Sequence, residues 1–134
     1  MTALIAQTTQ GSSVMRILNG ILAAFLVLFA VVQWNDPDGP LWIVIYGIGA
    51  VWCGPAAFRP AVYAGAVAAG LFGLCLLAAI GGMIWFWPDV SNWWDIDVWW
   101  PEVTGETSRE GMGMMVLVVC LLAAGSVVMQ ARRA

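Results

Sequence analysis

The sequence predicts an all-α integral membrane protein, a four-span transmembrane helix bundle with both termini cytoplasmic. Two observations predict this class: 62% of the 134 residues are hydrophobic, and only 10% carry a charge. A soluble domain of this length has far more charge. The hydrophobic residues gather into four stretches of about 20 residues, the length that crosses a bilayer core about 30 Å thick. Residues 1–134 are therefore expected to form a single transmembrane domain, with spans at 17–34, 41–58, 61–87 and 111–130.

The first span, residues 17–34, contains no charged residue and follows Met15-Arg16 in the manner of a signal peptide. The hydrophobic run is longer than the apolar region of a signal peptide, however, and no A-x-A cleavage pattern precedes Gln33. We therefore expect a transmembrane helix. The first fourteen residues, which include Gln, Thr and Ser, are expected to form a short tail outside the membrane.

A polar turn, NDPDGP, separates the first span from the second span at 41–58. Asn35 and Asp36 are good helix terminators, and Pro37 excludes Asp36 from the α-helical region. The glycine and proline that follow complete the reversal. A simple turn does not require two carboxylates beside a proline at the membrane surface, which indicates a further role for this segment.

The third span, residues 61–87, follows an Arg-Pro turn. Pro55 lies near the end of the preceding span, where a proline can end or kink a helix at little cost. Small residues recur at every fourth position at the start of the third span, and such a ladder lets another helix backbone approach closely. The partner is expected either within the bundle or in another subunit. The ladder consists of Ala61, Gly65, Ala69 and Gly73.

The third connection, residues 88–110, contains the segment PDVSNWWDIDVWWPEV, in which indole rings lie beside carboxylates. Such a segment is expected either to lie in the lipid headgroup layer or to cover a partner protein. Its candidate interaction residues are Trp93, Trp94, Trp99 and Trp100. The outer ends of the first three spans are expected to carry an interfacial aromatic belt of Trp34, Trp42, Trp85 and Trp87.

The charges segregate along the chain. All eight acidic residues lie in the first or the third connection, whereas Arg16, Arg59, Arg132 and Arg133 lie in segments on the opposite side of a four-span topology. The positive-inside rule places the arginine-bearing side in the cytoplasm. We expect a multi-pass protein of a plasma or inner membrane with its acidic loops outside, in the periplasm if the source is bacterial.

The chain has no histidine and three cysteines. The absence of histidine removes the commonest metal and haem ligand and the usual general base, which excludes His-ligated haem and Ser-His-Asp chemistry within this chain. Cys53, Cys75 and Cys120 lie inside the predicted spans without a CxxC motif and are interpreted as packing residues. We expect no cofactor and no nucleic-acid partner.

The fourth span, residues 111–130, is expected to begin at a capping box in the sequence TSRE. Thr107 would act as the N-cap, and Glu110 would reach back to the backbone N–H of Thr107. Arg109 has no role in that motif, although it is the only cation on the acidic side.

We therefore expect Arg109 to form a bidentate ion pair with Asp36 or Asp38, which would tie the first turn to the start of the fourth span. A fully exposed pair of this kind contributes only about 0 to 1 kcal/mol. If the pair is partly buried, loss of either partner would cost several kcal/mol, because a charge would be left uncompensated.

Two segments, QWNDPDGPLWIVIY and ETSREGMG, resemble the transmembrane protein 220 family. Its recurrent features are a Q-x-N-D-P-D turn followed by Trp and Tyr, and an E-x-x-R-E-x-x-G start of a later helix. The resemblance implies the four-span fold and a site at these residues, but no defined activity. The matching residues are Gln33, Asn35, Asp36, Pro37, Asp38, Trp42, Tyr46, Glu106, Arg109, Glu110 and Gly113.

The sequence favours a non-catalytic accessory or structural subunit, surrounded by membrane lipid, that binds other integral membrane proteins in a larger complex of respiratory or photosynthetic type. It offers no nucleophile-base pair and no redox ligands, and it has small-residue helix faces and an oily outer loop.

Two alternatives stay open. The first is an outward-facing calcium site, because calcium takes about six to eight oxygen ligands and several acidic and amide side chains are available on that side. The second is a carboxylate-dependent membrane enzyme that uses the same acids. The candidate ligands are Asn35, Asp36, Asp38, Glu106 and Glu110.

Overall fold

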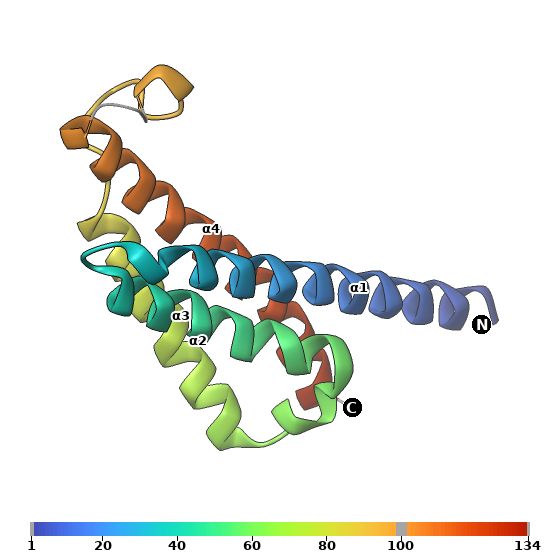
Figure 1. The fold of residues 1–134 in the computed structure, drawn as a ribbon. Helices are drawn as coiled ribbons and strands as arrows, with labels where there is room; N and C mark the ends of the chain where they lie inside the picture. The colour runs from blue at the N-terminus through green and yellow to red at the C-terminus, as the bar shows by residue number, and fades with distance from the viewer. Residues whose placement is uncertain (1, 99–101, 134) are drawn as a thin grey trace.

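The computed structural model describes residues 2–98 and 102–133, with the backbone alone for 2–11 and 102–104. Its four long helices are α1 (Thr2–Val32), α2 (Gly39–Phe58), α3 (Ala66–Trp85) and α4 (Glu102–Arg133), shown in Figure 1. Three short 3-10 helices lie in the connections: η1 (Gln33–Asn35), η2 (Pro60–Tyr63) and η3 (Ile96–Val98). Each long helix contains a segment long and apolar enough to cross a membrane. The predicted all-α, four-span class is confirmed.

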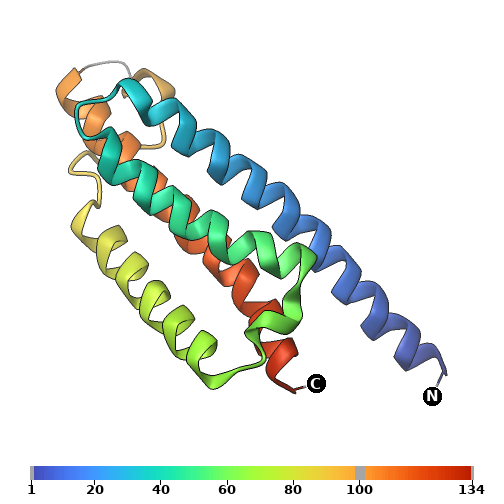
Figure 2. The ribbon, with the colours of Figure 1, turned by 60° about the horizontal axis from the view of Figure 1, so that its bottom comes forward.

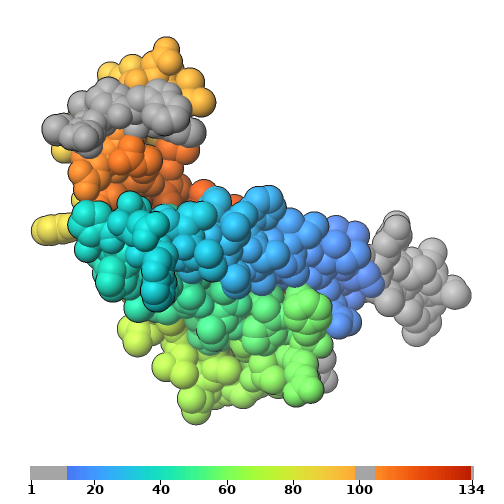
Figure 3. All heavy atoms as spheres, in the orientation of Figure 1, coloured from blue at the N-terminus to red at the C-terminus, as the bar shows by residue number. Residues whose placement is uncertain are grey.

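The helices pack side by side, and α4 packs against all three others (Figures 1 and 2). α1 and α2 also pack along each other and form the face seen in Figure 3, with α3 at its edge. Within the apolar segment of α4, 56% of the residues are buried, against 11% in α1 and in α3. The core therefore lies along α4. Its most deeply buried members include Leu26, Cys53, Ala56, Leu121 and Ala124.

α1, α2 and α4 meet closely at Gly49. A Cβ atom at this position would lie 2.7 Å from Cδ1 of Leu117 and 2.9 Å from Cδ1 of Leu26. In lipid, van der Waals packing holds helices together because the surrounding hydrocarbon is as apolar as the side chains. The missing side chain at Gly49 thus allows leucines from both neighbouring helices to fill the space against α2.

α2 ends at a proline-containing turn that positions the next helix. Pro55 lies inside α2, as predicted, and has no N–H to donate to the carbonyl group of Val51. The buried Tyr63 hydroxyl donates to the Trp52 carbonyl oxygen at 2.7 Å and lies 3.3 Å from the Val51 carbonyl oxygen. These contacts hold η2 against α2. The predicted third span at 61–87 is therefore too long, since α3 begins only after this anchored turn.

Two helices begin earlier than predicted. α1 starts at Thr2, so the expected non-membrane tail is helical, and α4 starts at Glu102 instead of residue 111. The predicted capping box is wrong because Thr107 lies inside α4. Hydropathy identifies the part of a helix that crosses the membrane, but no proline stops either helix from continuing through its polar residues.

Positive and negative charges lie toward opposite ends of the bundle. Nε of Arg16 donates to the carbonyl oxygen of Ala57 at 2.8 Å, which places this arginine beside the end of α2. α1 begins and α4 ends at the same end of the bundle (Figures 1 and 2). The acidic turn between α1 and α2 lies at the other end. The separation predicted from the order along the chain is therefore present in space.

Candidate functional site

Backbone hydrogen bonds hold the turn between α1 and α2. The Asp36 amide donates to the Gln33 carbonyl oxygen at 3.1 Å, and the Gly39 amide donates to the Asp36 carbonyl oxygen at 3.0 Å. Asp36 has an extended backbone, as predicted from the proline that follows it. Gly39 has no room for a side chain, because a Cβ atom would overlap the Gln33 carbonyl oxygen. This tight turn brings polar side chains to the end of the bundle.

Asp38 and Trp42 form the first fixed pair of the site. The Trp42 indole donates from Nε1 to Oδ2 of Asp38 at 2.5 Å, across one turn of helix. Trp42 is only 3% exposed, and its ring lies 5.5 Å from Phe86 at the end of α3 and 5.8 Å from Tyr46, between centroids. The prediction that Trp42 belongs to the interfacial aromatic belt is wrong, because its ring is buried and its indole N–H donates to Asp38 inside the protein.

Tyr46 lies one turn further along α2 and faces α4. A Cβ atom at Gly113 would overlap the Tyr46 hydroxyl oxygen and would lie 3.3 Å from the Trp42 ring. Tyr46 is only 6% exposed, yet no hydrogen bond to its hydroxyl is found in the described part of the chain. The four-residue spacing of Asp38, Trp42 and Tyr46 is the sequence signal that places the three on one helix face.

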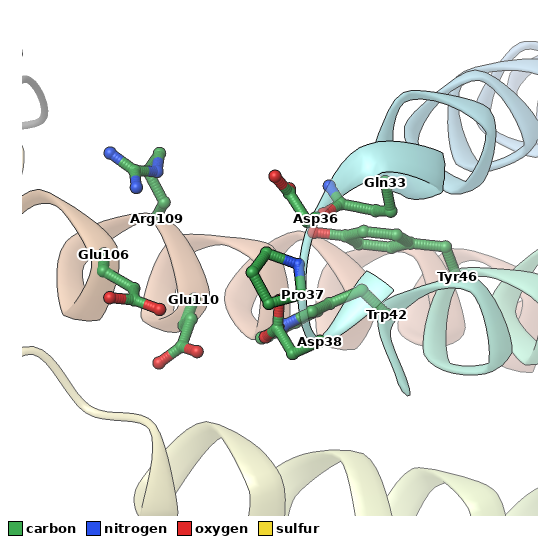
Figure 4. A pocket seen from close by; sticks show the side chains of 9 residues that line it. All are labelled: Gln33, Asp36, Pro37, Asp38, Trp42, Tyr46, Glu106, Arg109 and Glu110. Atoms are coloured by element: carbon green, nitrogen blue, oxygen red, sulfur yellow. The ribbon is translucent and has the colours of Figure 1, made fainter. Parts of the chain in front are cut away.

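α4 contributes the charged wall of the site. Glu106, Arg109 and Glu110 have helical spacing, so they lie near one another on the first turns of α4. Glu110 is partly buried, and the charges of Asp38, Glu106 and Arg109 act on it electrostatically. Figure 4 shows the two glutamates on one side of α4 and the guanidinium group of Arg109 on the other.

These two groups of residues line one cavity of about 470 Å³, a volume typical of small-molecule sites (Figure 4). About 70 residues separate its two walls in sequence, and both segments of the family resemblance contribute to it. The cavity therefore gives a shared location to the residues of both motifs. Its lining consists of Gln33, Asp36, Pro37, Asp38, Trp42, Tyr46, Glu106, Arg109 and Glu110.

The structure brings together most of the predicted site residues. Arg109, Asp36 and Asp38 all line the cavity, and their pairing as ions stays a prediction. Asn35, one of the predicted calcium ligands, is not part of the lining. In residues 2–98 and 102–133, no group of three or more His, Cys, Asp or Glu side chains is placed to hold a metal ion. The positions of these side chains therefore give the calcium alternative no support.

The tryptophan-rich segment lies near the same end of the bundle. Trp93 packs edge to face against Trp87 at 6.2 Å and against Trp94 at 5.6 Å. Trp94 is 64% exposed. The two remaining members of the predicted interaction set, Trp99 and Trp100, lie outside the described residues. The part described thus forms a small aromatic cluster in which the Trp87 and Trp94 rings are both exposed.

α3 presents a second candidate surface. Its inner side contains Phe72, which meets the Trp52 ring edge to face at 5.2 Å, and the buried Ala79. Several glycines of α3 and its N-cap face open space, because a Cβ atom there would meet nothing within 4 Å. Two of them, Gly65 and Gly73, belong to the predicted ladder, whereas Ala69 is half-buried. The open positions are Gly65, Gly70, Gly73 and Gly81.

Four membrane-spanning helices and a polar cavity at one end define this molecule as a multi-pass helix-bundle membrane protein. Its sequence matches the family model described as "Transmembrane family 220, helix" over residues 25–126. The protein therefore belongs to the transmembrane protein 220 family, and the resemblance seen in the sequence is confirmed. The match includes every residue that lines the cavity. No solved structure matches the chain.

Proposed function

We propose that this protein is a non-catalytic accessory subunit that binds another integral membrane protein through the open face of α3, in a larger complex of respiratory or photosynthetic type. The observation that carries the proposal is the one-sided packing of α3. Its inner side packs mainly against α4, while its outward side combines open glycines with exposed Val67, Leu74 and Leu77.

The glycines supply the physical argument. A glycine inside a helix destabilises it by roughly 0.5–1 kcal/mol relative to alanine. At Gly49 and Gly113 a close contact within the chain offsets this cost, but at Gly70, Gly73 and Gly81 nothing in the described structure approaches. In membranes, small residues at a helix surface favour close backbone contact with another helix. A helix from a partner protein would supply that contact.

Site-specific photocrosslinking in native membranes tests this proposal. A photoreactive amino acid replaces Leu74 on α3 or, as the control, Leu28 on α1; the two leucines are 65% and 54% exposed. We expect a discrete protein adduct from position 74 only, identified by mass spectrometry, and its loss when Gly73→Leu blocks close approach. Lipid adducts alone at both positions would overturn the proposal, and an adduct with a second copy of this chain would replace the accessory subunit with a homo-oligomer.

The cavity favours a second candidate, a carboxylate-dependent membrane enzyme. Such chemistry requires acids that converge on one space, and Asp36, Asp38, Glu106 and Glu110 all line the cavity. The enzyme would convert a ligand held there, so Glu110→Gln would abolish turnover more strongly than it weakens binding. Incubation of the purified protein with ligands that bind in the cavity, followed by mass spectrometry of the products, tests this candidate.

A further inference from the structure

The end of the bundle combines negative charge with buried aromatic rings in one cavity. Four of its nine lining side chains are carboxylic acids, and one is an arginine. A cleft lined mainly by one sign of charge concentrates ligands of the opposite sign. The cavity therefore favours a ligand that carries positive charge.

The lining offers more than an acidic cluster. Tyr46 is more than nine-tenths buried, lines the cavity, and has no hydrogen-bond partner for its hydroxyl within residues 2–98 and 102–133. The hydroxyl oxygen itself opens onto the cavity, because in the described residues Oδ1 of Asn19 is the only fully buried side-chain N or O atom without a hydrogen-bond partner. Gly113 leaves the room that this hydroxyl occupies, since any side chain there would displace it. An N–H donor on a ligand would complete the hydrogen bonding of Tyr46.

Trp42 supports the same class of ligand. Asp38 accepts its indole N–H, which holds both the ring and one carboxylate oxygen in place beside the cavity. A tryptophan ring attracts an organic cation more strongly than other aromatic rings do. A metal ion would instead need several carboxylates gathered around one point, and the described residues contain no such group.

We propose that this cavity binds an organic ammonium group, carried either by a lipid headgroup or by a soluble amine, with Asp38 and Glu110 as counter-ions and Trp42 and Tyr46 as the aromatic wall. The ammonium group donates to the carboxylates and to the Tyr46 hydroxyl, while its carbon substituents lie against the rings. This inference is independent of the α3 contact proposed above, and either can fail without the other.

Two arms of one experiment identify the source of the ammonium group. The full chain is placed in phosphatidylglycerol nanodiscs, and its thermal unfolding is measured with butylamine and with butanol, its uncharged counterpart. In parallel, native mass spectrometry counts the phosphatidylethanolamine and N-acetyl phosphatidylethanolamine molecules retained from an equimolar mixture. In one of the two arms, we expect the protein to bind the compound with the ammonium group at least tenfold more tightly than the counterpart without it. A response in the first arm indicates a soluble amine, and a response in the second indicates a lipid headgroup.

Variants connect binding to the cavity. Glu110→Gln and Asp38→Asn keep the shape of each side chain, and Asp38→Asn also keeps an acceptor for Trp42. Each should weaken binding at least tenfold, and Tyr46→Phe should weaken it severalfold. Asp89→Asn, at an exposed acid that does not line the cavity, should bind as the wild type does. If Asp38→Asn fails to fold, Glu110→Gln decides alone.

Three results would overturn the inference. The first is an equal response, in both arms, to the probe with an ammonium group and to its counterpart without one. The second is undiminished binding by folded Glu110→Gln. The third is saturable binding of calcium chloride, lost in Glu110→Gln, together with no preference for either amine.

Discussion

At the scale of single residues, the site depends on two fixed contacts, one between two side chains and one between a side chain and a glycine. Asp38 holds the Trp42 ring, and Gly113 leaves space for the Tyr46 hydroxyl. The sequence identified these residues as a motif, but it could not show which ones touch. Gly113 and Tyr46 lie far apart in the chain, and a glycine carries no hydropathy or charge signal that points to a neighbour. The contact depends on how α2 and α4 pack against each other in space.

The Gly113 contact predicts a pair of opposite effects. Gly113→Ala should lower the free energy of unfolding by about 1–3 kcal/mol, because its Cβ atom would overlap the Tyr46 hydroxyl. Gly47→Ala, in α2 with no atom within 4 Å, should instead be neutral or stabilising by up to about 1 kcal/mol. Thermal unfolding in detergent measures both. Equal effects at the two positions would show that the contact with Tyr46 is absent.

The hydrogen bond at Trp42 predicts a graded series. Asp38→Ala should cost about 1–3 kcal/mol, because it leaves a buried indole N–H without an acceptor. Asp38→Asn should recover much of that loss, since its amide oxygen can accept the same bond. The exposed Asp36 offers the matched control, and Asp36→Ala should change the stability by less than about 0.5 kcal/mol. Chemical unfolding curves rank the three variants, and equal losses at Asp38 and Asp36 would contradict the series.

At the scale of elements, hydropathy determines which part of each helix can cross the membrane. The residues at the helix ends determine where each helix begins and stops. The second span was predicted nearly to its bounds because Gly39-Pro40 marks its start and Pro60 follows its end. α1 and α4 extend further than predicted because their polar extensions contain no helix breaker. The third span was shortened by the turn that the Tyr63 hydroxyl anchors on the carbonyl oxygens of Trp52 and Val51, of which Pro55 leaves the second without its helical donor. A hydropathy profile contains no information on that contact.

The Tyr63 contact predicts coupling with Pro55. Tyr63→Phe should cost about 1–2 kcal/mol, because carbonyl groups at the end of α2 lose their donor. In a Pro55→Ala background the cost should be smaller, since the alanine N–H can donate to the Val51 carbonyl oxygen instead. A double-mutant cycle of thermal stabilities measures this coupling. Additive effects of the two substitutions would show that the hydroxyl does not compensate for the proline.

At the scale of the whole molecule, charge separation and topology agree. Arginines near the ends of α2 and α4 lie away from the acidic cavity, which is built from the α1–α2 turn and the start of α4. The sequence predicted this separation correctly, because an even number of spans returns the chain to the same side. It could not predict the cavity, which requires knowing that α4 lies beside the first turn.

The positive-inside rule predicts which end faces the cytoplasm. Single cysteines at Ala61 and Asp89, both exposed, are introduced after the three native cysteines are replaced by alanine. A membrane-impermeant maleimide added to intact cells should label position 89 and should reach position 61 only after the membrane is opened. The reverse pattern would show that the acidic cavity faces the cytoplasm.

The split of the cavity between two distant segments also has a consequence for biosynthesis. The ribosome produces the Asp38 turn about 70 residues before it produces Arg109, which corresponds to roughly 4–14 s at ordinary rates of translation. During that interval α1 and α2 can already form a hairpin, while the acidic turn has only half of its final surroundings. Insertion of α4 therefore completes both the four-helix bundle and the cavity, so an occupied cavity would report that a newly made chain has placed α4 beside the first turn.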